Sequence, residues 1–325
     1  AAPPVPSTRY IPIFILLNAS SLLFAASTFS SSHLSTIAIT GMLVAFVMIC
    51  YLLWEMNDNS QVANRYDTNW LLSAFAMGLI SHLLFLLSHL GLGQPFTGKL
   101  AVNIGFFLYL FMVVLTLSRK MIPFFTEGKV AGYKANRSRF FLEAVSLLLV
   151  IKVVLVTVYP IAYGFVIDLL LLAVTFSELI KWRLPIFSVE AILWVLYLSL
   201  LWIPVGFLLY SLEGMSQYLM GGEAMVFEKA PLHAIAIGYF TTILIGFGTR
   251  ILLGHSGQKV KADRVMIAVF WLIQLLVIIR VATGLALNFE ASWYSGFMVS
   301  STVLWLGLFM YWPASIGRRP LGLMA

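Results

Sequence analysis

The histidines at the two ends of one apolar run are of a type suited to cofactor chemistry. His233 opens the stretch HAIAIGYFTTILIGFGTRILLGHSG, and His255 stands near its end. On a continuous helix, at 1.5 Å per residue, the two imidazoles would lie about 33 Å apart, which is the thickness of a bilayer core. They cannot bind one ion together, so each needs a role of its own.

Four residues inside other apolar runs form a predicted polar layer. They are His82, Lys152, Asp168 and Arg280. Each stands about eight residues from one end of its run, or about 10 Å below one membrane surface. Charges at that depth are costly, so they should face the protein interior and find partners. Lys152 and Asp168 flank Pro160 and are expected to pair; alternatively, Lys152 or Arg280 binds an anionic cofactor group such as a haem propionate.

The histidines allow two interpretations. Haem held by two imidazoles needs them on facing helices, and His82 or His89 opposite His233 meets that demand. His82 and His89 are two turns apart, about 10.5 Å, so they cannot share an ion but can serve two sites. Neutral imidazole also suits copper, for which His33 in an outer loop is a further candidate ligand. The alternative is that these histidines are hydrogen-bonded packing residues.

Composition determines the class of protein. Of 325 residues, 61% are hydrophobic and 10% are charged, which predicts a polytopic membrane protein. The net charge of +7 does not indicate nucleic-acid binding, because the basic residues stand between apolar runs, where membrane topology places them. The one cysteine, Cys50, excludes a disulfide framework within the chain and a CxxCH haem-attachment site.

The positions of the apolar runs predict an all-α bundle of about ten transmembrane helices, because only helices satisfy their backbone in lipid on this pattern. The runs fall at roughly 10–30, 34–54, 69–90, 98–118, 140–159, 161–181, 187–211, 231–253, 265–287 and 292–312. The loops between them are short. We therefore expect a single transmembrane domain over residues 1–325.

The distribution of Lys and Arg predicts the orientation. With the N-terminus and the C-terminus in the cytoplasm, nearly all loop Lys and Arg residues fall on the cytoplasmic side. The other side holds only Lys99 and Lys229 among the loop cations. The polar layer and His233 then lie near the outer face, and Arg250 and His255 near the inner face.

Three segments carry a resemblance to a known family. The first is His233-Ala234, Gly238, Gly246, Thr249-Arg250 and Gly254-His255-Ser256-Gly257; the second is SRKMIPFFTEG, residues 118–128; the third is NRYDTNWLLSAFAMGLISHLLFLL. Taken in their order along the chain, they resemble the NnrS family of bacterial membrane proteins. The resemblance implies a haem- and copper-containing inner-membrane protein linked to nitric oxide and denitrification, without supplying a reaction, and it favours His233 as a ligand.

One departure from the family concerns the metal site. Longer members have twelve spans, and their second helix opens with His-x-His-Glu, which is not found here. The resemblance therefore implies a short form that lacks the first two helices and part of the metal site. That part would be remade with His33, His82 and His89, or supplied by another subunit.

The inner end of the eighth run also has two interpretations. Arg250 and His255 suit helix termination near the inner headgroups, since Gly254 and Gly257 end the helix there. The alternative is an inner-face cofactor site, in which Arg250 and Arg119 hold an anion at the mouth of a loop over residues 123–125.

Two functional hypotheses follow. The first is an NnrS-like haem b protein, with or without copper, in the bacterial inner membrane. It would act in the nitric oxide response or transfer electrons as a subunit of a respiratory complex, with other membrane or periplasmic redox subunits as partners. The second is a cofactor-free transporter or membrane anchor, in which Lys152, Asp168 and Arg280 conduct protons or anions.

Overall fold

A computed structural model describes residues 6–29, 32–159, 161–186, 189–221, 224–257 and 259–317, and all regular structure within these ranges is helical. The elements are α1 (Ser7–Ser27), α2 (Ser32–Asp58), α3 (Tyr66–His89), α4 (Thr97–Asn103), η1 (Ile104–Phe111), α5 (Met112–Glu127), α6 (Phe141–Val158), η2 (Ile161–Tyr163), α7 (Phe165–Trp182), α8 (Ala191–Met220), α9 (Ala230–His233), η4 (Ala234–Thr241), α10 (Thr242–His255), α11 (Arg264–Ala286) and α12 (Ala291–Gly317).

Membrane-spanning helices account for most of these elements. Within the described ranges, nine helical stretches are long and apolar enough to cross a membrane. They are α1, α2, α3, α4 to α5, α6, α8, α9 to α10, α11 and α12. The predicted all-α membrane bundle is confirmed.

Helix α7, which corresponds to the remaining predicted span, is set apart by its charges. It has 18 residues but contains Asp168, Glu178 and Lys181. Asp168 and Glu178 are buried, with exposed fractions of 3% and 2%. The Glu178 carboxylate accepts hydrogen bonds from the Ser138 backbone N–H at 2.9 Å and the Trp182 indole at 3.0 Å. These contacts allow an apolar helix to carry carboxylates without exposing them to lipid.

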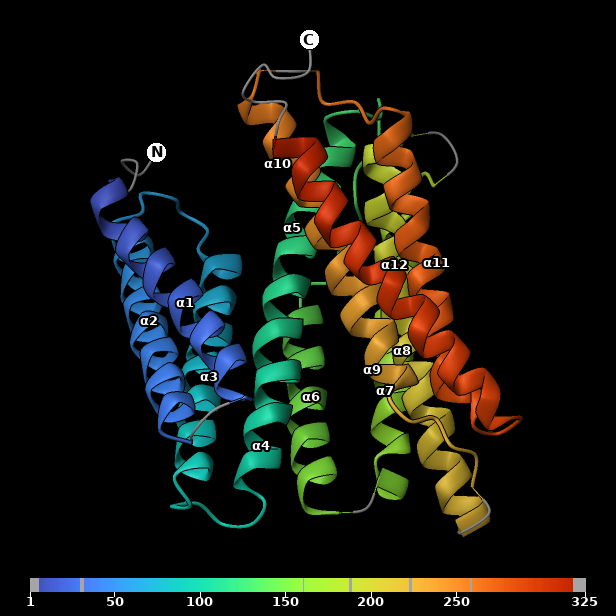
Figure 1. Cartoon of the computed structure of the whole chain (residues 1–325). Helices are drawn as coiled ribbons and strands as arrows, with labels where there is room; N and C mark the ends of the chain where they lie inside the picture. Colours follow the sequence, from blue (N-terminus) through green and yellow to red (C-terminus); the bar gives the residue numbers. More distant parts are fainter. Residues whose placement is uncertain are drawn as a thin grey trace. The chain divides into compact units, whose positions relative to one another are not determined.

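The chain forms two compact units. The first contains Ala1–Lys120 and Leu149–Tyr159, and the second contains Met121–Leu148 and Pro160–Ala325. In the first unit α1, α2 and α3 lie side by side (Figure 1). Phe46 and Tyr109 meet edge to face at 5.1 Å over Gly78, where an added Cβ would lie 2.7 Å from the Phe46 ring. At another place in this unit Arg119 pairs with Asp67 at 3.0 Å.

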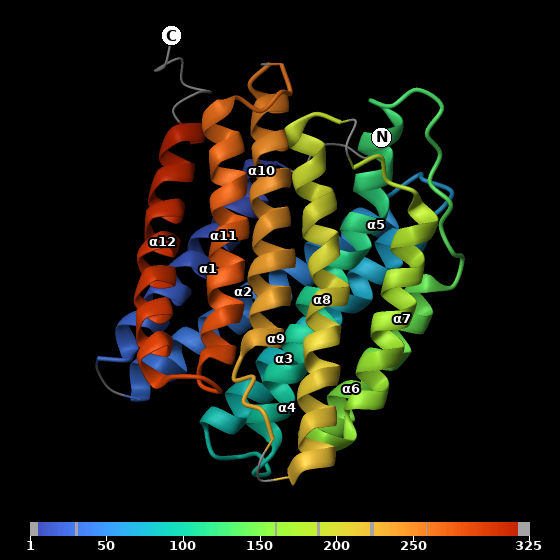
Figure 2. The ribbon, with the colours of Figure 1, turned by 90° about the vertical axis from the view of Figure 1, so that its right-hand side faces the viewer.

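The second unit is built around α8, which contacts α7, η4 and α10; α10, α11 and α12 stand next to one another (Figure 2). Small residues allow close contact between α8 and the α9–η4–α10 stretch. A Cβ added at Gly238 would lie 2.4 Å from the Trp202 ring, and one added to Gly206 would lie 2.4 Å from Ile235. The position of η4 is therefore set by its packing on α8.

Two spans contain a π-helical segment, which sequence periodicity did not predict. Both η1 and η4 have eight residues, and one occurs in each unit. In η4 the wider turn leaves carbonyls that hydroxyls can reach: Thr241 donates to the Ala236 carbonyl at 3.0 Å, and Thr242 to that of Ile237 at 3.3 Å. Such segments often occur at functional sites.

Two local predictions were wrong. His33 lies in the first turn of α2 and not in a loop. Residues 123–125 belong to α5, which continues through Pro123. Both segments extend beyond their apolar runs because backbone hydrogen bonding, and not hydropathy, sets where a helix ends.

Replacement of Gly238 by Ala tests the contact between η4 and α8. The new methyl group would overlap the Trp202 ring, so we expect Gly238→Ala to lower the free energy of unfolding by about 1–3 kcal/mol. Thermal unfolding in detergent, followed by intrinsic fluorescence, measures this. Gly254→Ala is the matched control, since its added Cβ has no neighbour within 4 Å among the described residues. Equal stability of the two variants would contradict the packing argument.

Candidate cofactor pocket around His233 and Arg280

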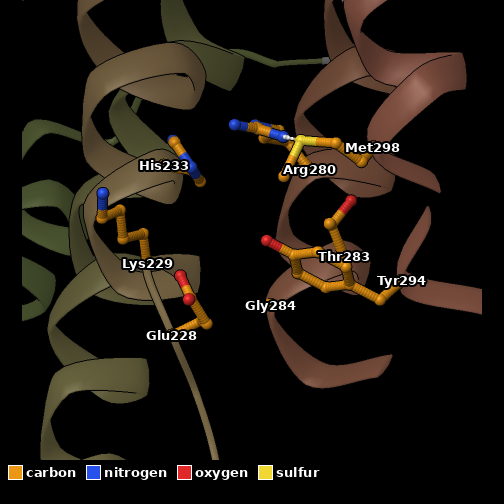
Figure 3. Close-up of a pocket in the computed structure, with 8 residues that line it drawn as sticks. All are labelled: Glu228, Lys229, His233, Arg280, Thr283, Gly284, Tyr294 and Met298. Atoms are coloured by element: carbon orange, nitrogen blue, oxygen red, sulfur yellow. Dashed lines mark hydrogen bonds between the residues drawn. The ribbon is translucent and has the colours of Figure 1, made fainter. Parts of the chain in front are cut away.

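His233 and Arg280 line two adjoining cavities in the second unit. The larger has a volume of about 410 Å³, and its other lining residues are Leu232, Ala236, Ile237, Leu276, Ser301, Thr302, Trp305 and Leu306. The smaller has a volume of about 140 Å³, and its other lining residues are Glu228, Lys229, Thr283, Gly284, Tyr294 and Met298 (Figure 3). One cavity is mainly apolar and the other is rich in charged and hydroxyl groups.

The position of His233 follows from the start of its span. His233 is the last residue of α9, and its backbone N–H donates to the Lys229 carbonyl at 2.8 Å. The π segment begins at the next residue. Gly284 of α11 lets that helix approach, because a Cβ there would lie 2.6 Å from the Phe227 carbonyl oxygen and 2.8 Å from the Ala230 methyl. The imidazole is therefore held between α11 and the start of η4.

Arg280 reaches toward His233 from α11 (Figure 3). Its Nη1 lies 2.6 Å from the Met298 sulfur, which is a weak acceptor. Among the described residues no carboxylate forms an ion pair with Arg280. A guanidinium has five N–H donors, so most of its hydrogen-bonding capacity is directed at the cavities. The arrangement suits an anionic group.

A series of hydrogen bonds inside the second unit leads to a wall of the larger cavity. The Trp202 indole donates to the Gln274 amide oxygen at 2.8 Å, and the Gln274 amide nitrogen donates to Thr242 at 3.2 Å. Thr242 donates to the carbonyl of Ile237, a residue that lines the cavity. The chain connects α8, α11 and η4. Sequence reasoning missed it, although Gln274 is a lone amide in the apolar run FWLIQLLVIIR.

The histidines of the first unit have different surroundings. His82 donates from Nδ1 to the Gly78 carbonyl at 2.9 Å, which leaves Nε2 as the lone-pair nitrogen. His89 Nε2 lies 3.0 Å from the Ser35 hydroxyl and 3.1 Å from that of Thr36. The His82 ring also stacks on Phe46, with ring centroids 4.5 Å apart, whereas His89 is bound by hydroxyls of α2.

Two predicted pairings join residues of different units and stay predictions. They are His82 or His89 with His233, and Lys152 with Asp168. Lys152 is buried, with 1% of its surface exposed, and its Nζ lies 5.1 Å from the centre of the Phe107 ring. The ring face accounts for part of the burial of this ammonium group.

The inner-face residues are also distributed between the units. Arg250 stacks on Phe125, with its guanidinium carbon 3.9 Å from the ring centre, so it does contact the predicted segment. Arg119 belongs to the first unit and binds Asp67. His255 ends α10 and is exposed. His33 is exposed as well. Within the described ranges no three His, Cys, Asp or Glu side chains gather in a metal-binding group.

Comparison with known proteins gives one match. A family model described as "NnrS protein" matches residues 1–319. The curated proteins and the solved structures give no match.

Replacement of Gln274 by Leu tests the hydrogen-bonded chain behind the pocket. The substitution would leave the buried Trp202 N–H without its acceptor, so we expect a loss of about 1–3 kcal/mol in the free energy of unfolding. Thermal unfolding provides the measurement, and a blue shift of Trp202 emission relative to the parent protein would accompany the loss. Gln61→Leu, at an exposed loop position, is the control. A Gln274→Leu protein as stable as this control would show that the chain contributes little.

Proposed function

The chain belongs to the NnrS family, and from this premise we propose that it binds haem b through His233 in the larger cavity. It is a multi-pass membrane protein of the nitric oxide response. We place the pocket near the periplasmic face of a bacterial inner membrane, where the distribution of Lys and Arg predicts the start of α9 to lie.

One observation carries the proposal: an imidazole and a guanidinium face the same cavity from α9 and α11. A volume of about 410 Å³ lies within the range of cofactor pockets, about 300–1,000 Å³. The walls include Trp305, Leu306 and Leu276, which suit a flat apolar macrocycle. Imidazole is the commonest protein ligand of haem iron, and arginine binds carboxylates such as propionates. The residues present therefore fit haem.

The chain's own residues have separate tasks in this proposal. Bound haem supplies a redox-active iron that binds diatomic gases or passes single electrons. His233 supplies the lone pair of a neutral imidazole, and Arg280 balances the charge of a carboxylate. The apolar wall excludes water. The chain from Trp202 through Gln274 to Thr242 fixes η4, and thereby the turn that carries His233.

Copper stays a prediction from the family resemblance, and among the described residues no three His, Cys, Asp or Glu side chains form a group for it. We therefore derive no step through copper. The same proposal includes electron transfer, a role in denitrification and contact with other membrane or periplasmic redox subunits. Each of these roles depends on haem being bound.

The proposal is tested by replacing His233. The purified protein should give a sharp α-band in its reduced-minus-oxidised spectrum, with about one haem per chain. We expect His233→Ala to lose most of the haem and Arg280→Leu to weaken haem binding by about 10- to 100-fold. His255→Ala, at the exposed end of α10, should keep its haem and is the matched control.

Full haem retention in a folded His233→Ala protein would overturn the assignment of the ligand. A wild-type protein that folds without haem after expression with haem supplied would overturn the haem proposal itself. The transport hypothesis would then be tested by pH-linked flux in proteoliposomes, which Asp168→Asn should abolish.

A further inference from the structure

We propose that the smaller cavity binds a small inorganic oxyanion of the size of nitrite or nitrate. This inference goes beyond haem binding and does not depend on it. The cavity has a volume of about 140 Å³. A water molecule occupies about 30 Å³ of liquid, so the cavity has room for an ion of a few heavy atoms.

The charges that line the cavity favour an anion. Lys229 and Arg280 are positive, and Glu228 is the one carboxylate among the lining residues. The Tyr294 hydroxyl adds one donor, whereas the Thr283 hydroxyl already donates to the Ile279 carbonyl at 2.8 Å. Among the described residues neither Lys229 nor Arg280 forms an ion pair with a carboxylate. Two cations against one carboxylate leave the lining with a net positive charge.

The geometry suits a planar oxyanion. Figure 3 shows the Tyr294 hydroxyl directed into the cavity from α12 and Arg280 above it, whereas the Lys229 side chain lies on the opposite side with its ammonium directed away from Tyr294. A guanidinium presents parallel N–H groups that bind two oxygens of one planar anion, and an ammonium adds a point charge. The Met298 sulfur is a poor competitor for these donors.

The exposure of the lining residues also agrees with a binding site that is open to solvent at one end. Glu228 and Lys229 are exposed, whereas Thr283 is 97% buried, with 3% of its surface exposed. The cavity therefore extends from solvent toward buried groups of α11. A cation in a membrane span is stabilised by a counter-ion, so the anion would offset the cost of placing Arg280 there.

The residues of the smaller cavity can be changed without touching the walls of the larger one. Lys229, Tyr294 and Glu228 line only the smaller cavity, whereas His233 and Arg280 line both. An anion bound here would lie beside the proposed haem pocket. A cofactor carboxylate is the other possible source of the same anion chemistry, and the experiment must separate the two.

Isothermal titration calorimetry with sodium nitrate, against a constant chloride background, measures binding to the purified full chain in detergent. We expect saturable binding that Lys229→Gln weakens by about tenfold or more and Tyr294→Phe weakens by several-fold. Glu228→Gln should tighten binding, because it removes the opposing charge. Lys99→Gln, at an exposed lysine on the same predicted side of the membrane, is the matched control.

Absence of saturable nitrate binding to wild type, or equal binding by wild type and Lys229→Gln, would overturn the proposal. The titration is repeated with haem-loaded and haem-free preparations. Binding to both supports a free oxyanion site, and binding only to haem-free protein assigns the cavity to a cofactor carboxylate and overturns it. If the protein binds nitrate but no haem, the proposed function is wrong and the oxyanion site is still supported.

Discussion

The contact between Trp202 and Gly238 determines much of the second unit. The indole fills the space that a side chain at Gly238 would take, and its N–H must find an acceptor because lipid offers none. Gln274 supplies the acceptor from α11 and uses its own amide N–H to reach Thr242. This series of hydrogen bonds holds α8, α11 and η4 together, and η4 is the π segment that follows His233.

The same unit contains a second group of polar residues that is not satisfied in this way. The hydrogen bonds that begin at Trp202 end on a backbone carbonyl, and the Trp202 indole, the Gln274 amide and the Thr242 hydroxyl each donate to an acceptor. Arg280, by contrast, ends on a thioether and faces two cavities. Arg280, beside the His233 imidazole, therefore differs from the hydrogen-bonded residues Trp202 and Gln274 of the same unit. This contrast is the reason why both proposals centre on His233 and Arg280.

The sequence predicted the helical bundle, because hydropathy and charge report directly on lipid contact. It also singled out His233 and Arg280. It did not predict the π segments, since a shift of backbone hydrogen bonds by one residue leaves hydropathy unchanged. It gave no means of separating His82 from His89, because their difference lies in the partners that α2 and α3 supply. The Trp202–Gln274 contact joins positions far apart in the chain, so no local pattern could reveal it.

The two π segments have similar neighbours along the chain. Each occurs after a short helix, and each is followed on the same helix by an arginine that stacks on an aromatic ring, Arg119 on Tyr66 and Arg250 on Phe125. The residue before η1 is Asn103, and the residue before η4 is His233.

These two residues differ in what they face. Asn103 donates to the Thr157 hydroxyl at 3.1 Å, so that polar position is closed within the first unit. His233 opens onto cavities shared with Arg280. Two π segments of the same length thus begin after residues in different surroundings, an amide with an internal partner and an imidazole that lines two cavities. The ligand role that we propose for His233 rests on this difference.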